Sequence, residues 1–187
     1  MPHVKPAFEF LDAHAKEFKE LVKPLSLLYI GWRHDGSPWW YDKFGPAMGV
    51  TKFGVLEIFP KNVADLEMKV WDGRYNVDVI EGDARKIAAF VKPGEWDVIY
   101  WDHGPEHVTW EDLKECTPKL FDVAGKMLLY SAPWGDWPQG MEDGNEHEVH
   151  RNSLTLEQFQ ELGFYNTACF GGPSQTLEGE LCGWMIK

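Results

Sequence analysis

The feature that most constrains this chain is an alternation of short, continuously apolar segments with amphipathic ones. Apolar residues three and four positions apart predict helices that begin at Pro60, just after Asp83, and near Glu106, the last ending near Leu120. Because parallel strands need helical crossovers, this alternation predicts an α/β fold with a mostly parallel sheet. The apolar segments, typical of strands buried on both faces, span residues 25–31, 52–59, 75–83, 96–102 and 125–133.

Both ends of the chain extend this pattern. An amphipathic helix is predicted over residues 6–22, within an N-terminal segment 1–24. Near the other end, a predicted helix over 155–163 precedes two apolar segments, 164–170 and 180–187, which can pair as an antiparallel hairpin. We therefore expect a doubly wound, Rossmann-like sheet of seven strands, mostly parallel with an antiparallel last strand, and helices on both faces.

No linker or internal repeat divides the sequence, so we expect a single domain over residues 1–187. The regular pattern breaks over residues 133–153, which are rich in Gly, Trp, acidic residues and His. A segment this long without periodicity is usually functional when it is not disordered, and we interpret it as an inserted active-site loop. Four tryptophans near turns either form an aromatic lid or pack loops onto the domain. They are Trp39, Trp40, Trp134 and Trp137.

The charge balance bears on possible partners. The chain has 18 basic and 30 acidic side chains, a net charge of −12, and no cluster of Lys and Arg. Such a field repels a phosphate backbone, so we expect a small-molecule substrate and no nucleic acid. The sequence shows no signal peptide and no long apolar span, so we expect no membrane association and a cytoplasmic location.

Polar residues follow the predicted strands where a parallel sheet binds ligands, at the carboxyl ends. Gly31 ends the first strand, and Glu57 lies at the end of the second. An acid at the position of Glu57 is placed to accept hydrogen bonds from both ribose hydroxyls of a nucleotide cofactor. Asp83, after the third strand, either accepts from an adenine amino group or caps the following helix. Asp102 ends the fourth strand, where Gly and Pro then force a turn.

At these residues the sequence resembles the class I S-adenosylmethionine-dependent methyltransferases. The order of elements is similar over nearly the whole chain, and the run "HGPEH", with "PWG", "QG" and "GNEHEVH", resembles a branch found among bacterial and phage sequences. The resemblance implies S-adenosylmethionine as cofactor. It also implies a set of cofactor-binding residues around the strand ends. These are Tyr29, Gly31, Trp32, Glu57, Ile58, Asp83, Ala84, Asp102, His103 and Gly104.

The first motif departs from the family pattern of an acid followed by glycines at alternate positions. Tyr29 replaces the acid, and Arg33 and Asp35 replace two glycines, with Gly36 displaced by one position. Side chains at these positions limit how closely the backbone approaches a ligand. Three interpretations follow: recognition of the methionine end differs, the cofactor differs, or the site is vestigial.

Two pairs of histidines accompany the strand ends. His103 and His107 open the helix after the fourth strand, where the resemblance places the methyl-transfer site, and we predict both, with Asp102, as catalytic residues. Either histidine can act as a general base. His147 and His150 lie in the long loop and are interpreted as solvated. Histidines three apart near carboxylates can also bind a divalent metal, but we assign no metal ligand from the sequence.

Three functions are consistent with these patterns. The first is methyl transfer from S-adenosylmethionine to a small-molecule or sugar-like acceptor, a reaction that alignment of the reactants largely drives. The second is S-adenosylmethionine binding without methyl transfer. The third is a nicotinamide-dependent oxidoreductase, which shares the ribose-binding acid but usually needs a Gly-x-Gly-x-x-Gly motif that this sequence lacks.

Overall fold

The computed structural model describes residues 25–32, 49–73, 76–170 and 179–187. The predicted helix over 6–22 lies outside the described residues. The same holds for the segment 33–48, which includes the altered glycine positions and two of the four tryptophans considered above.

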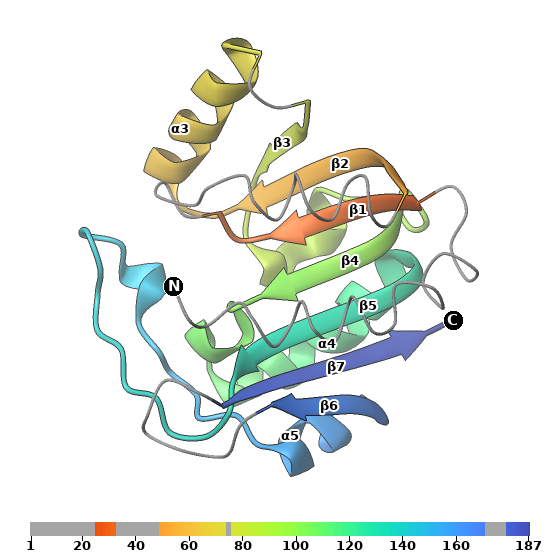
Figure 1. The fold of residues 1–187 in the computed structure, drawn as a ribbon, viewed down its shortest axis with the longest axis vertical. Coiled ribbons are helices and arrows are strands. Elements are labelled where there is room, and N and C mark those ends of the chain that lie inside the picture. Colours follow the sequence, from red (N-terminus) through yellow and green to blue (C-terminus); the bar gives the residue numbers. More distant parts are fainter. Residues whose placement is uncertain (1–24, 33–48, 74–75, 171–178) are drawn as a thin grey trace.

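The described strands form one sheet of seven in the order β3-β2-β1-β4-β5-β7-β6 (Figure 1). The first five strands pair in parallel, and β7 is antiparallel to both β5 and β6. This confirms the mostly parallel sheet with an antiparallel last strand. The final hairpin forms with β7 inserted beside β5, so β6 is the edge strand. Their bounds are β1 Leu25–Ile30, β2 Val50–Glu57, β3 Asp78–Glu81, β4 Trp96–Asp102, β5 Ala124–Pro133, β6 Asn166–Phe170 and β7 Glu180–Ile186.

The helices follow the predicted alternation, with two local differences. The helix expected near 106–120 is divided, because extended backbone at Val108 separates a 3-10 turn from α4, and Thr109 caps α4 by accepting from the N–H of Asp112. The helix expected after Asp83 is a 3-10 helix. The bounds are α3 Pro60–Trp71, η1 Ala84–Ala89, η2 Pro105–His107, α4 Trp110–Val123, η3 Glu146–Glu148 and α5 Leu156–Glu161.

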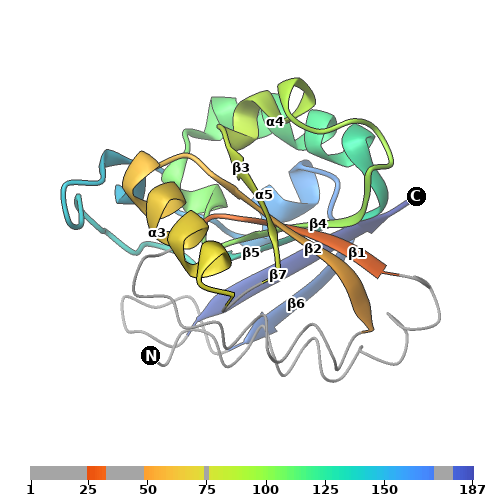
Figure 2. The same ribbon diagram turned by 90° about the horizontal axis from the view of Figure 1, so that it is seen from above.

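Apolar side chains fill both faces of the sheet. Helices α4 and α5 cover one face of the sheet (Figure 2). Their residues Leu113, Leu120 and Phe159 belong to one buried cluster with residues of the strands. On the other face, Leu66 of α3 packs in a second cluster with Val55 and other strand residues. The strands are therefore covered on both sides, which is why their sequences are continuously apolar.

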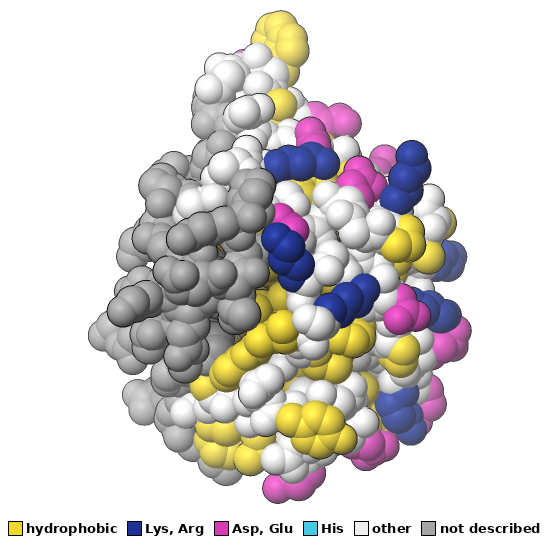
Figure 3. Space-filling view, turned by 90° about the vertical axis from the view of Figure 1, so that its right-hand side faces the viewer, with side chains coloured by type: hydrophobic (Ala, Val, Ile, Leu, Met, Phe, Trp, Pro, Cys, Tyr) yellow, Lys and Arg dark blue, Asp and Glu magenta, His cyan; other side chains and the backbone are white. Residues whose placement is uncertain are grey.

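The carboxyl ends of β1, β2 and β4 lie side by side and form the edge of the sheet where the parallel strands end. The segment 133–153 runs along that edge (Figure 1). The opposite edge presents Lys and Arg mixed with Asp and Glu, and shows no described histidine (Figure 3). Among the described helices, none is long and apolar enough to cross a membrane.

Close packing across the sheet generates a stability prediction. A Cβ added at Gly54 in β2 would lie 2.5 Å from the ring of Trp96, whose indole is buried. We expect Gly54→Ala to lower the free energy of unfolding by about 1–3 kcal/mol, because the ring must shift. Gly140→Ala is the control, because no atom of the described residues lies within 4 Å of the added Cβ, and it should change this free energy by less than about 0.5 kcal/mol.

Urea denaturation of both variants measures these changes. In a Trp96→Phe background the smaller ring leaves room, so the cost of Gly54→Ala should fall. Equal costs in the two backgrounds would show that contact with Trp96 is not the cause.

Candidate active site

Glu57 joins the ends of the neighbouring strands β1 and β2. Its side chain is buried, and its carboxylate accepts the backbone N–H of Trp32 at 2.5 Å and that of Phe59 at 2.7 Å. The side-chain amide of Asn62, on α3, donates to the carbonyl of Trp32 at 2.5 Å. The chain leaving β1 is thereby attached to the turn that begins α3.

The Glu57 carboxylate is buried and not exposed to solvent. Burial raises its pKa to about 7, although the hydrogen bonds from Phe59 and Trp32 act in the opposite direction. A carboxylate offers about four acceptor positions; the two N–H groups occupy two of them, and the side-chain amide of Asn62 also acts on this carboxylate. Glu57 therefore keeps acceptor capacity for hydroxyl groups of a ligand.

Gly31 follows β1, and its backbone conformation explains why glycine is needed at this position. Its φ is +92°, a conformation that side chains disfavour, and its N–H donates to the carbonyl of Leu56 at 2.9 Å. Among the described residues, a Cβ at this position would meet only the carbonyl of Asp102, at 3.9 Å, so no described residue blocks a close approach to the backbone on this side. Arg33 and Asp35 lie outside the described residues.

Asp102 is held by three hydroxyl groups from three strands. Tyr29 donates to it at 2.7 Å and Tyr100 at 2.8 Å, and Ser131 of β5 donates as well. Burial raises the pKa of both tyrosines well above the usual value, so both keep their protons. Tyr29, which stands where the family pattern has an acid, thus contacts an acid on the neighbouring strand. Nothing in the sequence pattern singled out Tyr100 or Ser131, because their proximity depends on strand pairing.

Asp83 caps η1, one of its two predicted roles. Its carboxylate accepts the backbone N–H of Arg85 at 2.9 Å and also binds the guanidinium of Arg85 at 2.8 Å. Burial opposes ionisation of Asp83, but these bonds lower its pKa overall. The adenine-binding role of Asp83 stays a prediction. Ala84 begins η1 and is buried, and Ile58 follows Glu57 and is partly buried.

Gly104 has a packing role beside its predicted place in the cofactor site. A Cβ there would lie 1.7 Å from the indole nitrogen of Trp101, so no other residue fits without a shift. The loop's Trp134 packs against the core cluster, as the packing alternative predicts.

His103 lies between two buried acids. Its backbone φ is +45°, its Nδ1 lies 3.5 Å from Glu106 and its Nε2 lies 3.8 Å from Glu180. Burial alone would lower the pKa of His103, but Glu106, Asp102 and Glu180 together raise it to about 10. His103 therefore carries a proton at neutral pH, which argues against its predicted role as a general base.

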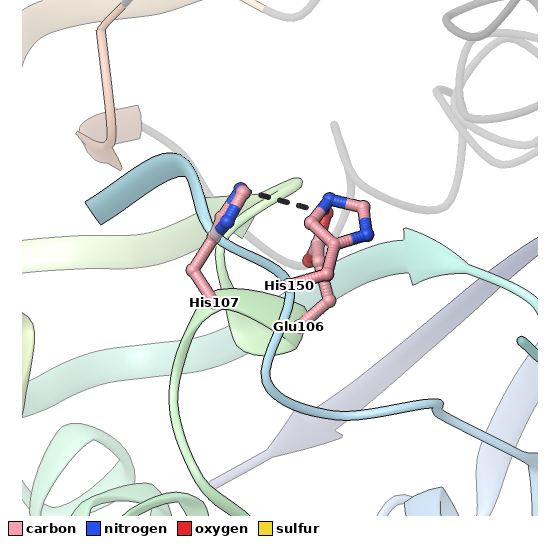
Figure 4. Close-up of side chains that lie close together, drawn as sticks. All are labelled: Glu106, His107 and His150. Carbon is pink, nitrogen blue, oxygen red and sulfur yellow. Dashed lines mark ion pairs between the residues drawn. The ribbon is translucent and has the colours of Figure 1, made fainter. Parts of the chain in front are cut away.

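His107 and His150 converge on the carboxylate of Glu106 (Figure 4). Each has its Nε2 3.9 Å from Oε1 of Glu106, and the two rings lie 4.8 Å apart. The backbone carbonyl of Glu106 accepts the N–H groups of Arg151 and Asn152, which attaches the long loop to η2. The side chain of His150 is 7% exposed, so its interpretation as a solvated loop histidine is wrong. Sequence analysis did not select Glu106, although it lies inside the "HGPEH" motif.

Comparison with known proteins gives a fold assignment. No protein-family model and no curated protein matches the chain. An S-adenosylmethionine-dependent methyltransferase from Clostridium acetobutylicum superposes with a TM-score of 0.66 at 8% identity, over 99% of this chain and 91% of the other. Magnesium protoporphyrin IX methyltransferase (ChlM) from Synechocystis PCC 6803, with bound S-adenosylmethionine, gives 0.61 at 12% identity, over 96% and 78%.

PigF, solved with S-adenosylhomocysteine (SAH), gives a TM-score of 0.59 at 18% identity, over 97% of this chain. The chain spans 55% of the length of PigF. The chain therefore has the fold of the class I S-adenosylmethionine-dependent methyltransferases. Fold alone does not decide the activity.

The buried Glu57 generates a prediction about pH. Because its pKa is raised from 4.5 to about 7 on folding, the folded chain binds more protons than the unfolded chain between these values. The stability that this proton contributes is fully present below pH 4.5 and is lost as pH rises through 7, by up to about 1.4 kcal/mol per pH unit.

Urea denaturation from pH 5 to pH 8 measures this effect. Relative to Glu57→Gln, which does not titrate, the native chain should lose stability as pH rises over this range. Parallel pH profiles for the two proteins would contradict the raised pKa.

Proposed function

We propose that this protein is an S-adenosylmethionine-dependent methyltransferase that acts on a small-molecule or sugar-like acceptor. The observation that carries the proposal is the buried carboxylate of Glu57 at the end of β2, beside the open backbone of Gly31. Structural neighbours with the same fold include proteins solved with S-adenosylmethionine or SAH. In open α/β sheets, this edge is where nucleotide cofactors bind.

The described residues fit such a cofactor at its ribose. Glu57 would accept the two ribose hydroxyls through its unoccupied lone pairs, and Gly31 would let the ligand approach the backbone. Asp83 and Ala84 follow the neighbouring strand β3 and are the candidates for the adenine side. Asp83 would then share its carboxylate between the ligand and Arg85.

The bound cofactor would supply the methyl group as a sulfonium. The chain's own contribution would be mainly to position the acceptor and exclude water, because a sulfonium is already activated for displacement. Asp102 is fixed by three hydroxyls and His103 is protonated, so both are better suited to orienting an acceptor than to removing its proton. His107, in the turn after β4, remains the predicted general base.

The charge distribution supports a small acceptor. The chain carries a net charge of −12, and three acidic residues of the loop, Glu142, Asp143 and Glu148, line a pocket whose one basic residue is Lys61. Phe59, Asn62 and Asn145 complete the described lining. A polyanionic acceptor would be repelled from this edge. Hydroxyl-bearing molecules can instead donate hydrogen bonds to these carboxylates.

Calorimetric titration with SAH tests the cofactor. We expect micromolar binding, and Glu57→Ala should weaken it by about 1.5–3 kcal/mol, the range for hydrogen bonds to a charged group. Glu67→Ala, which removes an exposed acid in the middle of α3, is the matched control for net charge and should leave binding unchanged.

The same titration has a pH signature. Ribose hydroxyls favour the ionised carboxylate, so binding should release protons near pH 7, and affinity should fall by up to about tenfold for each pH unit below 7. NAD serves as the competing cofactor. Binding of NAD but not SAH would favour the oxidoreductase alternative, and SAH binding without methyl transfer in an acceptor screen would favour a non-catalytic binder.

A further inference from the structure

Glu106 is a buried carboxylate whose neighbours are imidazoles at ion-pair distance and not close hydrogen-bond donors. It is 2% exposed, and neither of its carboxylate oxygens has a hydrogen-bond partner among the described residues. Burial of a carboxylate without hydrogen bonds is costly, so such a group calls for a specific explanation. Its neighbours are the imidazoles of His103, His107 and His150, at 3.5 to 3.9 Å from Oε1.

The hydrogen bonding of His150 shows which of its ring nitrogens faces Glu106 without a proton. Its Nδ1 lies 2.5 Å from the carbonyl of Trp137, and a carbonyl only accepts, so Nδ1 carries a proton. In the neutral ring, Nε2 then presents a lone pair, and this atom faces Oε1 of Glu106 at 3.9 Å. Two acceptors that face each other repel unless a positive species lies between them.

His107 completes the arrangement from the other side. Its Nε2 is 3.9 Å from the same oxygen, and ligand atoms of all three residues lie within 4.8 Å of one another. Ligands on a tetrahedral ion with bonds of about 2.0–2.1 Å are separated by about 3.3–3.4 Å. A contraction of about half an ångström would therefore bring the two ion-pair distances to those of a metal site.

We propose that Glu106, His107 and His150 bind a divalent transition-metal ion in an open site, and an imidazole bound in this way would not act as the general base predicted for His107. Two imidazoles and one carboxylate suit zinc, cobalt, iron or manganese, whereas magnesium and calcium prefer oxygen ligands. Three protein ligands leave at least one coordination position for water or for an oxygen of a bound molecule. The hydrogen bond from Nδ1 of His150 to Trp137 orients the ring, as outer hydrogen bonds do for metal-bound histidines.

A second trio at the same edge, Asp102, His103 and Glu180, is less suited to a metal. Asp102 already accepts three hydroxyls, so its oxygens are largely occupied. His103 has Nδ1 3.5 Å from Glu106 and Nε2 3.8 Å from Glu180, so both of its ring nitrogens already face a carboxylate. The ion therefore belongs with His107 and His150.

Metal binding by this site does not depend on the proposed cofactor. The three ligands come from η2 and from the loop after β5, whereas the ribose contact comes from β2. Failure of SAH to bind would not contradict the proposed metal site. Failure of the metal to bind would not contradict the proposed role of Glu57.

The test is titration of the tag-free, full-length protein with Zn²⁺ after removal of metals by a chelator. We expect one tightly bound equivalent, a rise in melting temperature, and with Co²⁺ a visible absorption band whose intensity reports the coordination number. Mg²⁺ should not compete. Each of Glu106→Gln, His107→Ala and His150→Ala should weaken Zn²⁺ binding by at least tenfold, since even outer-sphere changes cost 10–100-fold.

His147→Ala is the matched control, because His147 lies in the same loop but outside the cluster. It should bind Zn²⁺ like the native chain. Circular dichroism without metal checks that each variant folds, and Glu106→Gln keeps the shape of the side chain. Absence of stoichiometric Zn²⁺ binding to the native chain would overturn the proposal, as would equal affinity in folded Glu106→Gln and His150→Ala.

Discussion

Four acidic side chains lie largely out of water at one edge of the sheet, and the folded chain must compensate each of them. Glu57 accepts two backbone N–H groups, and Asp102 accepts three hydroxyls. Glu106 and Glu180 instead face His103. Because an uncompensated buried carboxylate costs several kcal/mol, the loops at this edge are restricted to positions that supply these partners. The same contacts that compensate these acids therefore also fix the local fold around the site.

The type of compensation decides what each acid can do. Hydroxyl donors hold Asp102 in place, which fixes its carboxyl group beside the end of β1. Glu57 keeps unoccupied lone pairs, and its pKa of about 7 makes its charge responsive to a ligand. Glu106 faces His103 on one side, and on the other it faces His107 and His150 at 3.9 Å, where a metal ion would join the three side chains. Three neighbouring carboxylates therefore have three different chemistries.

The altered first motif has a structural counterpart. Where the family pattern has an acid on β1, this chain has Tyr29, and its hydroxyl binds Asp102 on β4. The acid at this part of the edge is supplied by the neighbouring strand, in a sheet whose order matches that of the fold family. A divergent strand end is therefore compatible with the same architecture, which is why activity has to be argued from the site.

The sequence alone determined the strand and helix alternation, the parallel sheet and the positions of Gly31, Glu57 and Asp102 at strand ends, because periodicity and strand ends are local properties of the chain. It did not reveal the insertion of β7 beside β5, or the separation of η2 from α4, where one capping threonine outweighed a continuous periodic pattern. Nor did it reveal the contact of His150 with Glu106. These two residues are 44 positions apart in the sequence, and only the tertiary structure brings them together. It does so through hydrogen bonds from the loop backbone to the carbonyl of Glu106. A contact between residues this far apart leaves no periodic signal in the sequence.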